Sequence, residues 1–201
     1  MTNFEFIFSL LVILLGLALA AILGGVAKVM KIRPRVRIGW ATGLLASWVT
    51  TETIIFWQIF WRTRDALPGS PSMLFAGFFI TALYYFAAAS VFPDDLEGRT
   101  ELDGYFMREK GKVIGAILVA LPLSLALWGA VLGRRAYDAL DWFDWVTLGI
   151  MYVAGPVALM TKRRNVAIIC LGLLVALDLL DPVATSILPG ADFGHPLSEK
   201  S

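Results

Sequence analysis

Cysteine and histidine are nearly absent from this sequence of 201 residues, which contains only Cys170 and His195. A single cysteine allows no internal disulfide, no CxxC redox motif and no thiolate metal cluster. A single histidine cannot supply the paired axial imidazoles of a membrane b-type cytochrome. Because His195 lies in the tail near the C-terminus, outside the apolar segments, we expect no base for a Ser-His intramembrane protease. We therefore expect no haem, no metal and no other cofactor.

Charge is also scarce. Only 16% of the residues are charged, against 58% hydrophobic, and the mean hydropathy is +0.75. These are too few ionisable side chains to cover a water-soluble globule of this size. The formal net charge of +1 provides no basic field for nucleic acid. The composition predicts an integral membrane protein that binds no nucleic acid.

Long apolar segments recur along the chain, separated by short charged connections. Because a hydrocarbon core of about 30 Å needs about 20 apolar residues in a helix, each segment is long enough to cross a bilayer. The sequence predicts an all-α, polytopic transmembrane helical bundle of about six helices in a single domain, residues 1–201. The predicted helices cover residues 4–27, 38–61, 71–92, 113–132, 142–160 and 166–188.

The first segment has a second interpretation, because Ala18-Leu19-Ala20 resembles the small-residue cleavage site of a signal peptide. However, residues 1–6 contain no basic side chain, and the apolar stretch exceeds the 7 to 15 residues of a signal-peptide core. We expect a retained helix.

The basic residues predict an orientation. Most of the 17 Lys and Arg fall in the first, third and fifth connections: Lys28, Lys31, Arg33, Arg35, Arg37, Arg99, Arg108, Lys110, Lys112, Lys162, Arg163 and Arg164. The other side has only Arg62, Arg64, Arg134, Arg135 and Lys200. By the positive-inside rule the odd-numbered connections are cytoplasmic, which places both termini outside.

Small residues recur at intervals of four on the first two predicted helices. They are Gly16, Ala20 and Gly24 on the first helix, and Gly39, Gly43 and Ser47 on the second. Membrane helices associate closely along such tracks, so the pattern predicts that these two helices form a tight pair. The alternative is that Gly and Ala are simply frequent in membrane helices.

Acidic residues inside the apolar segments are the candidate functional residues. Glu52 lies among threonines near the middle of the second helix, and Asp178 and Asp181 lie three residues apart on the sixth. At 1.5 Å per residue, Glu52 and Asp178 lie at a similar depth, about 20 Å along their helices. The three residues are a possible proton or cation site, because two carboxyl groups at one depth share a proton or bind a cation.

A structural role is the alternative for the same residues. A neutral Glu52 would hydrogen-bond a threonine, Trp48 or a backbone carbonyl, and Asp181-Pro182 would cap the end of a shorter sixth helix.

Two further groups of acids lie in connections. Thr100 to Asp103 has the pattern of a helix cap, so we expect a short amphipathic helix on the membrane surface, with Leu102, Tyr105 and Phe106 on its apolar side. The acids of this connection lack the spacing of a calcium loop. Asp138, Asp141 and Asp144 have the spacing of a solvated helix face, or alternatively of a cation-attracting mouth.

Sequence motifs of enzymes are missing. The chain has no GxSxG, no GxxxxGK[ST], no HExxH and no GxGxxG. A lipid-modifying enzyme that uses Asp94 and Asp95 in the acidic connection is a minor alternative. We expect a protein that is not an enzyme.

A pattern of short motifs covers roughly residues 1–110: GGVA at 24–27, FWQ at 56–58, YYFAA at 84–88, FPD at 92–94 and DGYF at 103–106. In these the chain resembles bacterial inner-membrane proteins of unassigned function. The resemblance implies a bacterial cytoplasmic membrane and supplies no active site.

Two hypotheses follow. The leading one is a non-enzymatic accessory bundle whose partners are the lipid bilayer and other membrane proteins or further copies of itself. The alternative is a small proton- or cation-coupled transporter or channel that uses Glu52 and Asp178.

Overall fold

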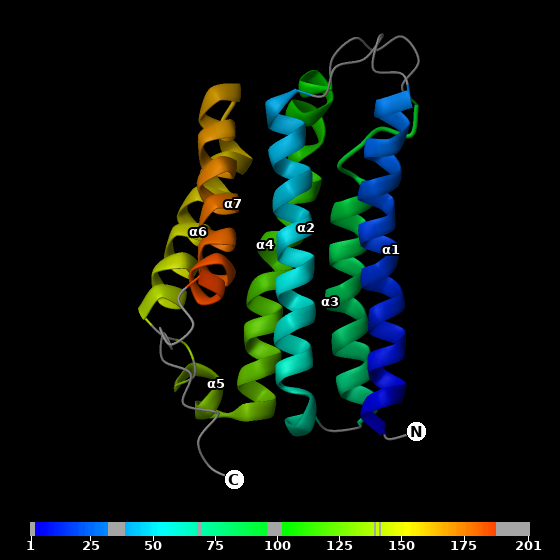
Figure 1. Ribbon diagram of the computed structural model, residues 1–201, viewed down its shortest axis with the longest axis vertical. Coiled ribbons are helices and arrows are strands. Elements are labelled where there is room, and N and C mark those ends of the chain that lie inside the picture. The colour runs from blue at the N-terminus through cyan, green and yellow to red at the C-terminus, as the bar shows by residue number, and fades with distance from the viewer. Residues whose placement is uncertain are drawn as a thin grey trace.

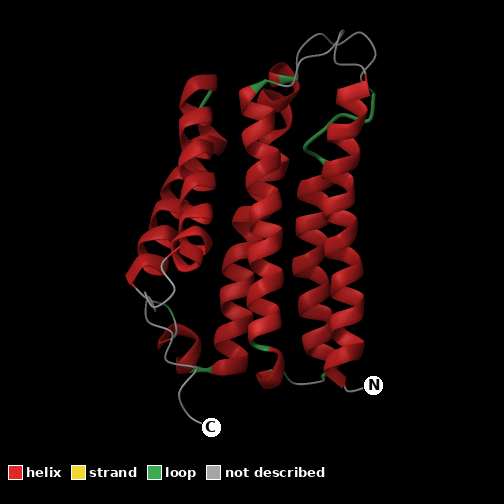
Figure 2. Cartoon of the chain, in the orientation of Figure 1, coloured by secondary structure: helices red, strands yellow, loops and turns green. Residues whose placement is uncertain are grey.

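The apolar segments fold into a bundle of helices (Figure 1). A computed structural model describes residues 3–31, 39–67, 70–95, 102–138, 140 and 142–187. These described residues form helices and loops but no strand (Figure 2). The elements are α1 (Asn3–Lys31), α2 (Trp40–Arg62), the 3-10 helix η1 (Arg64–Ala66), α3 (Pro71–Ala89), α4 (Asp103–Leu132), α5 (Arg134–Asp138), α6 (Trp142–Met160) and α7 (Arg164–Ile187). The prediction of an all-α bundle is confirmed.

Four of the described helices are long and apolar enough to cross a membrane. They are α1 from Phe8 to Lys31, α3, α4 and α6. The chain therefore has the make-up of an integral membrane protein. The remaining long helices, α2 and α7, are not among the four, and they are the helices that carry Glu52 and Asp178. The count of six membrane-crossing helices stays a prediction.

The helices alternate in direction, so that α1 begins and α7 ends toward the same end of the bundle (Figure 1). We call the other end, where α1, α3 and α6 finish and α2, α4 and α7 begin, the basic end, because Lys28, Lys31, Lys110, Lys112 and Arg164 lie there. Helix α2 contacts α1, α3, α4 and α7, and is the element around which the polar residues described below are arranged.

The predicted tight pair of the first two helices is wrong, because α1 packs mainly against α3. The buried face of α1 carries mostly larger apolar side chains, and its residues recur at intervals of three and four: Leu11, Leu15, Ala18, Ile22, Gly25 and Val29. The small residues of the predicted track, Gly16, Ala20 and Gly24, are exposed on another face.

Glycine does allow close contact elsewhere in the bundle. A Cβ at Gly25 of α1 would lie 2.3 Å from Cδ2 of Phe92, and a Cβ at Gly77 of α3 would lie 2.9 Å from Cδ1 of Leu11. Of the predicted track on α2, Ser47 is exposed and Gly39 faces Asp103. The close approaches at Gly25 and Gly77 therefore depend on glycines that the four-residue spacing did not identify.

Helix α4 begins ten residues before the predicted start at residue 113, at Asp103. The predicted surface helix is therefore wrong, since the segment continues directly into the apolar part of α4. The physical reason is that Phe106, Lys110, Val113 and Ile117 follow one another on a single buried stripe of the helix. The predicted cap at Thr100 lies outside the described residues.

Helix α7 continues past Asp181 and Pro182 to Ile187, close to the predicted end at residue 188, so the alternative in which Asp181 ends a shorter helix is wrong. The predicted stripe of acids on one helix is also wrong. Asp138 is the last residue of α5, whereas Asp144 lies on α6, so these acids do not form a stripe on one helix. Asp141 lies outside the described residues.

Candidate functional site

Glu52 is buried in the middle of α2, with only 2% of its surface exposed. It lies on the helix face that carries Leu45, Val49, Phe56 and Phe60, all of which are buried. Its Oε1 atom has no hydrogen-bond partner among the described residues. An unpartnered buried polar atom is costly, so this carboxyl group requires an explanation beyond packing.

Asp178 lies opposite, on α7, and is 6% exposed. The face of α7 that packs against α2 is an apolar stripe of Ala167, Leu171 and Leu174, and Asp178 is the next residue on that stripe. Its Oδ2 atom lies 3.2 Å from Oγ1 of Thr51, the residue before Glu52. The two carboxyl groups are close enough to interact electrostatically. The structure therefore brings together Glu52 and Asp178, as their equal depths predicted.

Aromatic polar groups complete the surroundings. The buried indole Nε1 of Trp48 lies near the Glu52 carboxyl but forms no hydrogen bond of ordinary geometry. Tyr84 of α3 is 1% exposed and within electrostatic reach of both carboxyl groups. We call Trp48, Thr51, Glu52, Tyr84 and Asp178 the carboxyl cluster.

Tyr152 of α6, which is partly exposed, lies within electrostatic reach of Glu52 from the outside of the carboxyl cluster. No described Lys or Arg forms an ion pair with either Glu52 or Asp178. The carboxyl cluster thus joins α2, α3 and α7 without a compensating basic side chain. Two carboxyl groups that interact in such surroundings do not readily carry two negative charges.

The third predicted site residue, Asp181, lies on α7, but its side chain is outside the described part of the structure. The carboxyl cluster is therefore described without it. Among the described residues, no three Asp, Glu, His or Cys side chains gather in the manner of a metal site.

A second group of buried charges lies at the basic end. Asp103, at the start of α4, is 5% exposed, and its Oδ1 accepts from both the backbone N–H and the hydroxyl of Thr42, each at 3.3 Å. Thr42 is in the first turn of α2, where backbone N–H groups lack helical partners. Asp103 therefore caps α2 from a different helix. Its Oδ2 also lies 3.7 Å from Nη1 of Arg164, at the start of α7.

Lys110 caps the C-terminal end of α6 in a similar way. Its Nζ donates to the carbonyl oxygens of Ala158, at 2.7 Å, and of Thr161. These carbonyls lie at the end of α6, where a positive charge interacts favourably with the helix dipole. Asp103 and Lys110 of α4 thus fix the ends of α2 and α6 at the basic end.

Sequence reasoning missed Asp103, Lys110 and Tyr84 as buried polar residues. The signal for the first two was present, because Asp103, Phe106, Lys110 and Val113 repeat at intervals of three and four, which places both charges on the apolar face of α4. Tyr84 stands in an aromatic segment that has no local signal to distinguish it from its neighbours.

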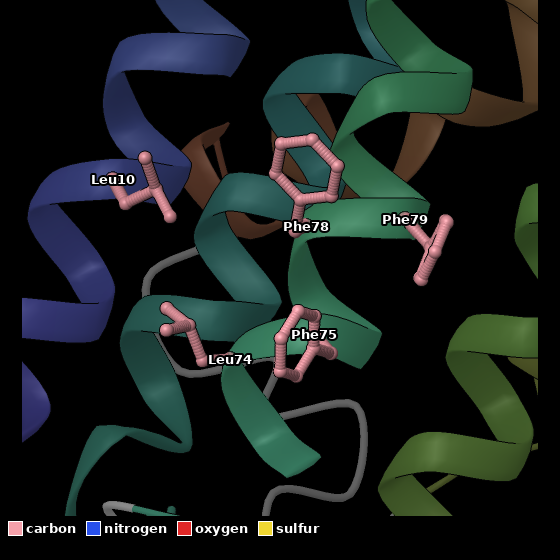
Figure 3. Close-up of a pocket in the computed structure, with 5 residues that line it drawn as sticks. All are labelled: Leu10, Leu74, Phe75, Phe78 and Phe79. Carbon is pink, nitrogen blue, oxygen red and sulfur yellow. The ribbon is translucent and has the colours of Figure 1, made fainter. Parts of the chain in front are cut away.

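The bundle also has an apolar cavity of about 220 Å³ between α1 and α3 (Figure 3). It is lined by Leu10, Leu74, Phe75, Phe78 and Phe79. Phe75 and Phe79 are strongly exposed, so this hollow belongs to the outer surface of the bundle. It contains no polar group that would support chemistry or the selection of an ion.

Comparison of the chain with family models, with curated proteins and with solved structures finds no match. The carboxyl cluster itself is therefore the basis for assigning a function.

Proposed function

We propose that this chain is a proton- or cation-coupled membrane protein, a small transporter or channel whose ion-binding step uses Glu52 and Asp178. The observation that carries the proposal is the Glu52 carboxyl, 2% exposed, with an unpartnered oxygen beside a second buried carboxyl. The protein is not an enzyme and needs no cofactor in this proposal, because the chemistry is limited to gain and loss of an ion.

A charged acid inside a membrane bundle is energetically unfavourable. A charged carboxyl near the centre of a bilayer costs about 2.5 to 3.5 kcal/mol, and such residues typically mark the pathways of ions and protons. Here two buried acids lie on the packed helices α2 and α7 with no described basic partner, so the cost is not offset by an ion pair. An apolar residue at either position would stabilise the bundle better, and function is the remaining reason to keep an acid there.

The membrane arrangement that goes with this proposal has six crossing helices. The basic end faces the cytoplasm, since Lys and Arg accumulate on that side of membranes. Both termini are then outside. The membrane is the bacterial inner membrane, in keeping with the resemblance of residues 1–110 to proteins located there.

The test is ion flux in vesicles that contain the purified protein, with an imposed pH, sodium or potassium gradient. Glu52→Gln and Asp178→Asn keep the size of each side chain but remove its charge. We expect each to reduce the flux of the coupled ion to the level of empty vesicles. Two matched controls should retain full flux: Glu109→Gln, at a partly exposed position of α4 where the acid pairs with Lys112, and Asp138→Asn, an exposed acid of α5.

If the unaltered protein carries no ion, or if Glu52→Gln and Asp178→Asn carry ions at the normal rate, the proposal is wrong.

An accessory bundle that binds other membrane proteins or further copies of itself is the second candidate. The specific observation in its favour is the face of α1 that carries Gly16, Ala20 and Gly24, which the bundle leaves exposed. Crosslinking in native membranes separates the two candidates. An accessory protein gives a defined adduct that Gly16→Leu and Gly24→Leu abolish, whereas a transporter that works alone gives none.

A further inference from the structure

The hydroxyl of Thr51 makes two polar contacts, but it has only one hydrogen to donate. Its Oγ1 lies 2.9 Å from the backbone carbonyl oxygen of Trp48 and 3.2 Å from Oδ2 of Asp178. The carbonyl oxygen can only accept a hydrogen bond. Which of the two oxygens supplies the hydrogen in the contact between Thr51 and Asp178 therefore depends on the direction of the Thr51 O–H bond.

Other hydroxyl groups in the bundle indicate the direction of the Thr51 O–H bond. Thr50 and Thr53 of the same helix donate to the carbonyls of Ala46 and Val49, at 2.8 and 2.7 Å. Ser124 of α4 donates to the carbonyl of Ala120 at 2.7 Å. Such bonds to the preceding turn are usual for Ser and Thr in helices of apolar surroundings. The shorter contact of Thr51, to Trp48, belongs to this group.

With the Thr51 hydrogen directed to Trp48, Thr51 faces Asp178 with a lone pair. A carboxylate oxygen there would face another acceptor, and the contact would be repulsive. A protonated Asp178 instead donates to Thr51, and Oδ2 of Asp178, Oγ1 of Thr51 and the backbone carbonyl oxygen of Trp48 then each have a partner in this series of contacts.

We infer that the ion held by the carboxyl cluster is a proton carried on Asp178, and that Thr51 is the positioning residue that accepts a hydrogen bond from it. This inference rests on the proposed function and narrows the coupled ion to a proton.

The other groups around Asp178 are consistent with a proton and unsuited to a metal cation. The indole Nε1 of Trp48 has no lone pair and cannot serve as a ligand. A calcium ion requires about six oxygen ligands, whereas the one side-chain oxygen that the described residues place in hydrogen-bond contact with Asp178 is that of Thr51. The titratable groups that face Asp178 and its partner are Glu52 of α2, Tyr84 of α3 and Tyr152 of α6, all of which exchange protons.

Infrared difference spectroscopy of the full chain in lipid vesicles tests the inference directly, because a protonated carboxylic acid has a carbonyl band separate from that of a carboxylate. Spectra recorded across a pH titration should contain such a band, and Asp178→Asn should remove it. Thr51→Val removes the hydroxyl at constant shape and should shift the band to higher frequency, whereas Thr51→Ser should restore its position. Asp138→Asn is the control and should change nothing.

A second measurement uses only the unaltered protein. Addition of sodium or potassium at constant pH should leave the band intact. Loss of the band on addition of either cation, or its survival in Asp178→Asn, overturns the inference, as does a band that Thr51→Val does not move.

The two proposals fail in different ways. Sodium flux together with displacement of the band by sodium would retain the transport function and refute the proton on Asp178. An Asp178 band with the expected shifts, in vesicles that show no flux, would refute transport and retain the proton.

Discussion

Asp103 Oδ1 of α4 accepts two hydrogen bonds from Thr42 of α2, at 3.3 Å from its backbone nitrogen and 3.3 Å from its hydroxyl. The side chain of one helix thereby caps the first turn of another. A Cβ at Gly39, just before α2, would lie 1.9 Å from the same oxygen, so this approach depends on glycine at that position.

We predict that Asp103→Ala lowers the free energy of unfolding by about 0.5 to 2 kcal/mol, the usual range for loss of a helix cap. Asp103→Asn keeps an acceptor for Thr42 and loses only the charge opposite Arg164, so its effect should be smaller. Thermal unfolding in detergent, followed by circular dichroism, measures both. Asp138→Ala removes an exposed acid and is the control; an equal loss in this variant would contradict the capping role of Asp103.

Lys110→Met should also destabilise the bundle. It removes the donor from the carbonyls of Ala158 and Thr161, and each buried acceptor left without a partner costs about 1 to 3 kcal/mol. Lys112→Met is the matched control, because Lys112 is two residues away and its side chain is 62% exposed. The same unfolding measurement should separate the two variants, and similar midpoints for both would be incompatible with a cap on α6.

Adjacent glycines of α1 should respond in opposite directions to the same substitution. Gly25→Ala places a Cβ against the ring of Phe92, and overpacking of this kind costs about 1 to 3 kcal/mol. Gly24→Ala meets no atom within 4 Å and should stabilise the helix by up to about 1 kcal/mol through its better helix propensity. The midpoints of thermal unfolding measure this difference between the two variants. In a Phe92→Ala background, Gly25→Ala should cost less than it does in the unaltered protein, because the ring that it meets is absent.

Glu52→Leu should increase stability while it abolishes function. The substitution removes a buried oxygen that has no hydrogen-bond partner, and the relief of that penalty is about 1 to 3 kcal/mol. Ser47→Leu, at an exposed position of the same helix, controls for added apolar surface. A marked loss of stability in Glu52→Leu would show that the acid has a structural role.

The sequence was sufficient for the all-α bundle of long helices and for the proximity of Glu52 and Asp178, but not for α5 or for the start of α4. Apolar segments of about 20 residues predict membrane helices directly, and the fixed rise of a helix converts sequence position into depth. Glu52 and Asp178 lie at a similar depth on helices that run in the same direction. They therefore come together if those two helices are neighbours. The structure supplies that adjacency, since α7 packs its stripe of Ala167, Leu171 and Leu174 against α2.

The sequence was not sufficient to predict which helices pack against each other. The track of Gly16, Ala20 and Gly24 suggested that α1 pairs with α2, but α1 presents Leu11, Leu15 and the residues that follow on that face to α3. In an apolar solvent, contact among many larger side chains competes with close approach of small ones, and one sequence does not reveal which contributes more. The capping roles of Asp103 and Lys110 also depend on which helices are neighbours, because each side chain caps a helix that is distant in the chain. The sequence therefore did not reveal them.

The central claim is that Glu52 and Asp178 act as one unit. The most direct measurement is proton flux through vesicles for Glu52→Gln, Asp178→Asn and the double variant, with Glu109→Gln as the control. The account predicts that each single variant reduces flux to the level of empty vesicles and that the double variant causes no further loss, because groups that act together are not additive. Partial losses that multiply in the double variant, or flux that survives in either single variant, would contradict it.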